Sequence, residues 1–225
     1  MAYSIKQGSV MEGIFAMYCA AFLIDPEDGK NKKSIEGFIN DLRVDTTLGT
    51  SLSNKDGIRV KTVEHLMAAF MGLGIDNAKV LLSAGEIPIM DGSSENFIKL
   101  IELAGVQEQY VSKKVIRVLK SFSIVDGDCS ISIEPSKDFI VDYKIDFEDP
   151  AIGVQSLKVN LKSDIFKNDI SSARTFGMMS EVQTMHDNGL ALGGSIDNAI
   201  VVDNGKILNP EGLRYKDEFV RHKIL

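Results

Sequence analysis

Apolar residues recur with two different periods along this chain, and each period predicts its own kind of element. In residues 62–72 they fall every three or four positions, which indicates a helix with one apolar face. We expect Thr62 to cap the start of this helix, and Gly72 and Gly74 to close its end. A second helix is expected over residues 97–104.

Three further features complete the helical part of the prediction. Ser93 or Ser94 can cap the helix over residues 97–104, because a side-chain oxygen there can accept a free backbone N–H. Another helical stretch runs through Met185, and residues 216–225 begin a last helix with acidic residues in its first turn.

Strands are predicted where apolar and polar residues alternate with period two. Residues 115–119, 129–134 and 139–147 follow this pattern. Residues 78–82 and 199–202 are short apolar runs that also favour strands. The mixture of helices and strands predicts an α+β fold of layered sheet and helices.

The character of the chain changes near residue 110, because strands dominate after it. We therefore expect two similar α+β domains, over residues 1–110 and 111–225, with a site in the crevice between them. A strand–helix–strand insert is expected around the glycine-rich loop 189–195, where a phosphate site or an ordinary turn would use the same glycines.

Composition narrows the function classes. The net charge of −7 argues against a general nucleic-acid binder, since phosphate binding needs clustered Lys and Arg. Cys19 and Cys129 are interpreted as free thiols in a reducing compartment. No run reaches the ~20 apolar residues of a membrane helix, and we expect residues 14–24 to form a buried strand or helix rather than a signal peptide.

Two of the three histidines lie in segments that suggest metal chemistry. His65 follows Glu64, and His222 precedes Lys223. Metal-assisted hydrolysis needs a Lewis acid that acidifies water and a carboxylate that takes its proton, so a histidine ligand beside a glutamate suits that reaction. Each motif alone also fits a partly buried histidine or a charged surface helix. His186, before a turn, is interpreted as a surface residue.

A polar pair in the middle of the second half admits two interpretations. Arg174 and Thr175 could offer an anion-binding end and a hydroxyl at the entrance of a helix. Residues of these types also serve as ordinary helix caps.

Taken together, the motifs closely resemble one family, the zinc-dependent UDP-3-O-acyl-N-acetylglucosamine deacetylases of lipid A (lipopolysaccharide) biosynthesis. The resemblance runs from about Asp41 to Leu225, in matching order and spacing. The segments that carry it are Thr62-Val-Glu-His-Leu, Gly72-Leu-Gly-Ile-Asp-Asn, Glu86-Ile-Pro-Ile-Met-Asp-Gly-Ser, Ser172-Ala-Arg-Thr-Phe-Gly, Leu190-Ala-Leu-Gly-Gly-Ser and Asp217-Glu-Phe-Val-Arg-His-Lys.

The resemblance implies a lipid-biosynthetic hydrolase that releases acetate from an acylated UDP-sugar. By matching positions it implies that His65 and His222 are zinc ligands, that Glu64 is the general base, and that Thr175 and Lys223 stabilise the oxyanion. It also implies that Phe176 contacts the sugar and that Phe147 stacks on the uracil. Gly193 and Gly194 would belong to a passage for the acyl chain, with Leu48 near its mouth.

The resemblance also implies parts that the 225 residues do not contain. Members of the family have an aspartate as a third zinc ligand one turn after His222, and a further histidine beyond it. Their Gly-Leu-His motif near the start has no counterpart in residues 1–40. We therefore expect a truncated or divergent copy that holds zinc weakly and has little activity.

The leading hypothesis is a cytoplasmic, monomeric zinc deacetylase with no nucleic-acid partner and no stable membrane span. The alternative is a non-catalytic descendant that binds the nucleotide sugar or a protein partner. Glu64, Thr175 and Lys223 favour an enzyme, because a binding module need not keep a base.

Overall fold

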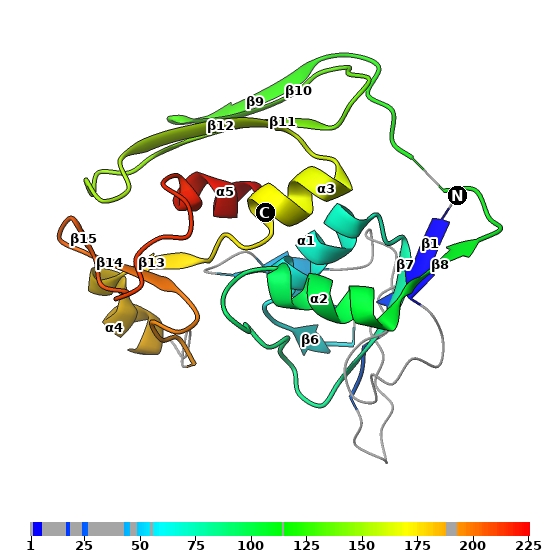
Figure 1. The fold of residues 1–225 in the computed structure, drawn as a ribbon, viewed down its shortest axis with the longest axis horizontal. Coiled ribbons are helices and arrows are strands. Elements are labelled where there is room, and N and C mark those ends of the chain that lie inside the picture. The colour runs from blue at the N-terminus through cyan, green and yellow to red at the C-terminus, as the bar shows by residue number, and fades with distance from the viewer. Residues whose placement is uncertain are drawn as a thin grey trace.

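A computed structural model gives the fold (Figure 1), and it describes residues 2–5, 17–18, 24–26, 43–45, 49–54, 56–113, 115–187 and 193–225. Helices and small sheets alternate along the chain, as the α+β prediction requires. The helices are α1 (Glu64–Leu73), α2 (Glu95–Ala104), α3 (Ser163–Ile165), α4 (Met179–Asp187) and α5 (Glu218–Ile224), with the π-helical turn η2 (Phe166–Ile170) directly after α3. Among the described residues, no helix is long and apolar enough to cross a membrane.

The described strands of the first half form two sheets. One has the order β2-β7-β1-β8, with β3 also pairing with β7, and the other has the order β4-β5-β6. Their bounds are β1 (Ala2–Ile5), β2 (Met17–Tyr18), β3 (Ile24–Pro26), β4 (Arg43–Asp45), β5 (Ser51–Ser53), β6 (Arg59–Val60), β7 (Asn77–Leu82) and β8 (Val106–Gln109).

In the second half, the described strands form two hairpins and one mixed sheet. The hairpins pair β9 with β10 and β11 with β12, and the mixed sheet has the order β13-β14-β15. Their bounds are β9 (Phe122–Asp126), β10 (Cys129–Ile133), β11 (Ile140–Asp146), β12 (Val154–Asn160), β13 (Phe176–Met178), β14 (Ile200–Asp203) and β15 (Lys206–Ile207).

Two hydrophobic clusters hold the described residues together. The larger surrounds α1 and α2 and takes in Phe166 and Ile170 from η2, while the smaller lies between α5, β11 and β14. Gly72 shows how closely the halves approach, because a Cβ there would lie 2.0 Å from a ring carbon of Phe166. Only glycine leaves room for that ring against α1.

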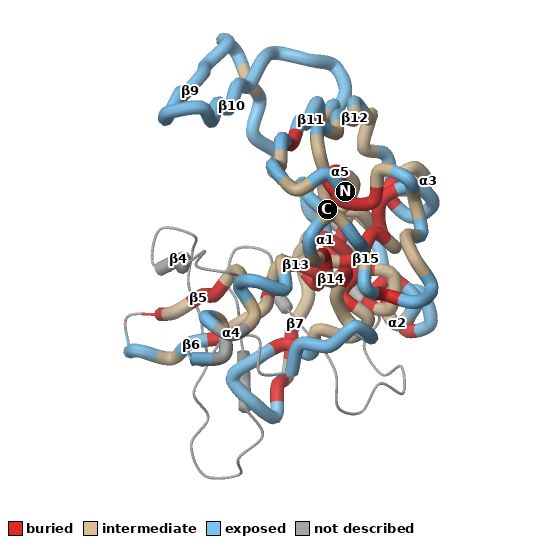
Figure 2. The backbone as a smooth tube through the Cα atoms, turned by 90° about the vertical axis from the view of Figure 1, so that its left-hand side faces the viewer, coloured by how far each residue is buried: buried red, intermediate tan, exposed pale blue. Residues whose placement is uncertain are grey.

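The β9–β10 hairpin contrasts with these clusters. Its apolar residues Phe122, Ile124, Ile131 and Ile133 face one side, because Phe122 pairs with Ile133 and Ile124 with Ile131. All four are at least half exposed, and Figure 2 shows the hairpin exposed along its length. The period-two pattern therefore predicted the hairpin's second strand, over 129–134, without predicting what the strand packs against.

The insert in the second half was predicted correctly. β13 and β14 are parallel neighbours with α4 between them in sequence, which is the expected strand–helix–strand unit. Parallel strands need such a crossover, and the helix supplies it.

Three local predictions were wrong, in whole or in part. Residues 115–119 form no strand. Thr62 does not cap α1, because its φ is +59° and its hydroxyl instead donates to Glu86 Oε1 at 2.6 Å. Ser94 occupies the N-cap position of α2 without a side-chain bond, while Ser93 Oγ accepts the Glu95 N–H at 3.2 Å.

Candidate functional site

Helix α1 places Glu64 and His65 at its first turn, between the two halves of the chain. His65 is only 2% exposed, whereas Glu64 stays partly accessible. Glu64 Oε2 accepts the backbone N–H of Thr50 at 3.0 Å, which fixes the carboxylate against the segment before β5. The Nδ1 atom of His65 is buried and has no hydrogen-bond partner among the residues that the structure describes. An orphaned ring nitrogen of this kind is costly unless a ligand or water completes it.

Helix α5 brings His222 to the same place from the other end of the sequence. The ring centroids of His65 and His222 lie 5.3 Å apart. His222 Nδ1 lies 3.1 Å from the carbonyl oxygen of Ala173. A carbonyl only accepts, so Nδ1 carries the proton and Nε2 carries the free lone pair.

Both imidazoles are held neutral. Removal from water lowers the pKa of His65, although the negative charges of Glu64 and Asp91 oppose this shift. Removal from water also lowers the pKa of His222 to about 3, and the neighbouring His65 adds to the effect, the Ala173 hydrogen bond opposes it, and Lys223 adds to it again. Neutral imidazole is the form that ligates a metal, so the pair has the right chemistry for one.

An aromatic cluster centred on Phe176 lies beside His222. Phe176 meets Phe219 and Phe147 edge to face, with centroids 4.9 Å and 5.6 Å apart, and its ring also lies 6.3 Å from that of His222. Lys223 is exposed, and its Nζ lies 5.3 Å from the Phe176 ring centroid. A cation near an aromatic face at this distance is attracted to it, so Phe176 helps to place the ammonium.

Backbone hydrogen bonds to Gly92 and Ile200 form a backbone strap that fixes the position of Thr175. Its N–H donates to the carbonyl of Gly92 at 2.7 Å, and its own carbonyl accepts from Ile200 at 2.8 Å. A Cβ on Gly92 would lie 2.1 Å from the Asn198 carbonyl oxygen, and φ at Gly92 is +81°. Glycine is therefore required for this close approach.

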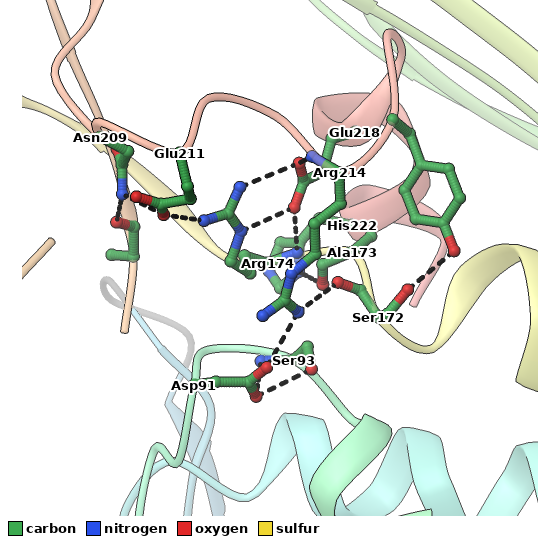
Figure 3. Close-up of polar contacts among 12 residues, drawn as sticks. Asp91, Ser93, Ser172, Ala173, Arg174, Asn209, Glu211, Arg214, Glu218 and His222 are labelled. Carbon is green, nitrogen blue, oxygen red and sulfur yellow. Dashed lines mark hydrogen bonds and ion pairs between the residues drawn. The ribbon is translucent and has the colours of Figure 1, made fainter. Parts of the chain in front are cut away.

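Arg174 and Glu218 form a buried ion pair beside the site (Figure 3). Arg174 Nε donates to Glu218 Oε1 at 2.9 Å, and the side chains are 3% and 0% exposed. Arg174 also pairs with Glu211 and donates to the carbonyl of Gly212 at 2.7 Å. The interpretation of Arg174 as an anion-binding end for a ligand does not fit the structure, because the side chain is buried and already pairs with two carboxylates of the protein.

Asp91 and Arg214 tie the first half to the segment before α5. Arg214 Nη1 lies 2.9 Å from Asp91 Oδ2 and donates to the Ser172 carbonyl at 2.8 Å. Ser93 donates to Asp91 Oδ1 through its hydroxyl at 2.8 Å. Figure 3 shows Arg214 reaching from the loop before α5 to Asp91. Desolvation raises the pKa of Asp91, but the hydrogen bonds of Ser93 and Arg214 outweigh it and the net shift is downward.

Sequence reasoning missed Asp91, Arg214 and Glu218 as supports of the site. Glu218 could have been found, because it lies one helical turn before His222 and so shares its face of α5. The other two had no such signal, since an aspartate in a Gly-containing turn and a lone arginine are common on protein surfaces.

The expected site residues do not all converge. His65, His222, Phe176, Phe147 and Lys223 gather around one another, as the ring and cation distances above show. Gly193 and Gly194, which the family resemblance assigned to an acyl passage, are exposed on the chain before β14. Leu48 and the side chain of His186 lie outside the described residues.

The fit to a metal is partial. The imidazoles of His65 and His222 provide two donors of the kind that a transition metal prefers, and one of these rings has a buried nitrogen without a hydrogen-bond partner among the described residues. Over the described ranges, no group of three or more His, Cys, Asp or Glu residues gathers at metal-binding distance.

The chain is similar to known proteins over most of its length. The family profile of UDP-3-O-acyl N-acetylglycosamine deacetylase matches residues 22–225. Proteins named UDP-3-O-acyl-N-acetylglucosamine deacetylase are similar to the chain in Shewanella violacea, with 51% identity over 80% of the chain, and in Myxococcus xanthus, with 52% identity over 81%. The chain spans 60% and 58% of the length of these relatives. The chain belongs to the UDP-3-O-acyl N-acetylglycosamine deacetylase family.

Proposed function

We propose that the chain catalyses the zinc-dependent hydrolysis of the N-acetyl group of UDP-3-O-acyl-N-acetylglucosamine, with release of acetate, in lipid A biosynthesis. The observation that carries this proposal is the meeting of His65 and His222, both neutral, 5.3 Å apart between ring centroids. The names of the relatives support the substrate, an acylated UDP-sugar.

In this proposal His65 and His222 hold the zinc. Zinc bound there supplies a Lewis acid that acidifies water and polarises the amide carbonyl. Burial lowers the pKa of both histidines, which favours the neutral rings that a metal binds.

Glu64 is the proposed general base. The Thr50 N–H holds Oε2, which leaves Oε1 to take the proton of the attacking water. That proton then passes to the nitrogen of the leaving sugar amine as the amide C–N bond breaks, so the products are a free amine and acetate. A positioned base of this kind typically contributes about 10²–10⁴-fold in rate.

Thr175 and Lys223 are the proposed partners of the negative charge that develops on the carbonyl oxygen. Lys223 is kept near the site by its contact with the Phe176 ring, and Thr175 by its backbone strap to Gly92. One well-placed donor is worth about 3–4 kcal/mol in such a transition state.

The remaining assignments concern substrate binding. Phe176 would contact the sugar, and Phe147, at its edge, would stack on the uracil. Gly193 and Gly194 would belong to the acyl passage, where each buried CH₂ contributes about 0.8 kcal/mol. The role of Leu48, a cytoplasmic location and a monomeric state stay predictions.

The division into domains 1–110 and 111–225 is likewise proposed. Its support is that the smaller hydrophobic cluster contains only residues after 110. The larger cluster consists mainly of residues before 110, with Phe166 and Ile170 as its buried members from the second half.

The test is acetate release from the acylated UDP-sugar, measured beside zinc content. We expect Glu64→Gln to lower kcat by about 10²–10⁴-fold while zinc content is unchanged. Glu95→Gln is the matched control, because Glu95 also begins a helix but lies on α2 in an exposed ion pair with Lys99.

Two results would contradict the proposal. A chain that retains no zinc and binds the sugar without hydrolysing it would support the non-catalytic alternative. Equal activity of Glu64→Gln and the wild type would exclude Glu64 as the base. The expectation of weak zinc retention is measured in the same experiment, by elemental analysis after dialysis against a moderate chelator.

A further inference from the structure

A single peptide group lies between two side chains of α5. Its carbonyl, from Ala173, faces His222 Nδ1 at 3.1 Å. Its N–H, from Arg174, donates to Glu218 Oε1 at 3.0 Å. The two bonds therefore leave opposite ends of the same planar unit and reach the same helix.

The spacing on α5 makes this arrangement possible. Glu218 and His222 are separated by one helical turn, so their side chains lie on one face of the helix. The peptide unit is rigid, since rotation about its C–N bond is strongly hindered. Fixing its N–H end therefore also fixes the direction of its carbonyl.

The carboxylate of Glu218 is itself held on all sides. It is fully buried, and it accepts from Arg174 Nε at 2.9 Å, from Arg174 Nη2 at 3.3 Å and from the backbone N–H of Arg214. Figure 3 shows Arg174, Glu218 and His222 around this peptide. A charged acceptor on the N–H also polarises the peptide and strengthens its carbonyl as an acceptor.

We propose that Glu218 is a positioning residue for His222 and acts through the Ala173–Arg174 peptide. Glu218 orients the peptide, the Ala173 carbonyl then holds the Nδ1 proton of His222, and Nε2 is left as the ligating atom. Metal-binding histidines commonly have a carboxylate or a carbonyl on the second nitrogen, and here a carboxylate acts through a carbonyl. The link to a metal rests on the proposed function, whereas the link to the ring does not.

The wild-type chain tests the first half of this proposal. Nitrogen-15 NMR of the metal-free protein distinguishes the two neutral tautomers of a histidine ring. We expect His222 to carry its proton on Nδ1. A wild-type His222 protonated on Nε2 would overturn the proposal without any variant.

Substitution tests the role of Glu218. The apolar double variant, Arg174→Met with Glu218→Leu, removes both buried charges, and such replacements often preserve the fold. We expect His222 in this variant to populate both tautomers. Arg174→Met with Glu218→Gln keeps a neutral acceptor for the peptide N–H, and we expect it to restore the Nδ1 tautomer.

A control separates positioning from stability. Val220→Ala, also on α5, truncates a fully buried side chain that does not take part in these bonds. We expect it to destabilise the protein and to leave the His222 tautomer unchanged. A tautomer that shifts equally in Val220→Ala and in the apolar double variant, or in neither of them, would overturn the positioning role.

Titration with Co²⁺, followed by its visible spectrum, provides the second measurement. Loss of the hydrogen-bond partner that orients a ligating histidine typically lowers metal affinity by about 10–100-fold. We expect this lower affinity in the apolar double variant alone. Wild-type affinity in that variant would overturn the proposal. A wild-type chain that takes up no Co²⁺ would instead contradict the proposed function, and the tautomer comparison would still decide the role of Glu218.

Discussion

The two histidines of the candidate site are supported in opposite ways. His65 is buried on α1, a helix whose Leu66, Ala69 and Phe70 are also buried, and its Nδ1 has no hydrogen-bond partner among the described residues. His222 is held by a hydrogen bond to Ala173 on a helix that the buried Arg174–Glu218 pair ties down.

This difference has a consequence for how each side responds to substitution. Apolar packing loses free energy in proportion to the volume removed, and a neighbour can relax into the space. A buried ion pair loses most when one partner is removed, because the other charge is left without compensation. Single substitutions should therefore damage the His222 side more than the His65 side.

The largest effect is expected from breaking the ion pair on one side only. Arg174→Met leaves the Glu218 carboxylate buried and uncompensated, and we expect a loss of about 3–5 kcal/mol in the free energy of unfolding. Chemical denaturation measures it. The double variant with Glu218→Leu should recover most of the loss, and a double variant as unstable as the single one would show that the charge is not the cause.

A somewhat smaller effect is expected on the apolar side. Leu66 is 1% exposed, and Leu66→Ala should cost about 2–5 kcal/mol, depending on how far the cavity collapses. Met71 lies on the same helix but is 65% exposed, so Met71→Ala should change stability by less than about 0.5 kcal/mol. Equal losses in the two variants would contradict the view that apolar packing stabilises the His65 side of the site.

The link between the halves should give a moderate effect that depends on pH. Asp91→Asn weakens its bonds with Arg214 and Ser93, and we expect a loss of about 1.5–3 kcal/mol at neutral pH. The folded pKa of Asp91 is lowered, so its contribution is complete above the unfolded value of about 3.9 and disappears as the pH falls through the folded value.

Denaturation at several pH values checks the Asp91 prediction. The stability of Asp91→Asn should fall less steeply than that of the wild type below about pH 4. Asp142→Asn, which removes an exposed carboxylate paired with Lys158, is the matched control and should change stability by about 1 kcal/mol or less. Identical slopes for Asp91→Asn and the wild type would rule out the contribution of Asp91.

The smallest effect is expected from an exposed pair outside both sides of the site. Lys99 and Glu95 form an ion pair on α2 at 3.0 Å, with side chains 60% and 38% exposed. Lys99→Ala should change stability by about 0.5 kcal/mol or less, because solvent screens such pairs. A change above about 1 kcal/mol would show that this exposed ion pair stabilises the protein more than solvent screening allows.

Local pattern predicted the elements well where one face is buried. The helices over 62–72, 97–104 and 216–225 appear as α1, α2 and α5, and the strand over 139–147 appears as β11. Residues 115–119 alternate but form no strand. A strand needs hydrogen bonds to a neighbouring strand, and the alternation does not predict whether such a neighbour is present. Thr62 failed as a cap because it bonds Glu86, which is distant in sequence.

The site divides in a similar way. Glu64, His65, His222 and Lys223 could be chosen from the sequence because their types and neighbours suit metal-assisted hydrolysis. That the two histidines meet, and that removal from water holds both neutral, required the packing of α1 against the segments around α5.

The sequence by itself therefore determined the chemistry that is available, since residue type sets which atoms can ligate, donate or take a proton. Tertiary structure alone decided which of these atoms are free. Arg174 looked available for an anion, but its buried side chain pairs with Glu218 and Glu211, while His65 Nδ1 has no hydrogen-bond partner in the described part of the chain. The physical reason is that burial and hydrogen bonding depend on residues far apart in the chain, which no local pattern records.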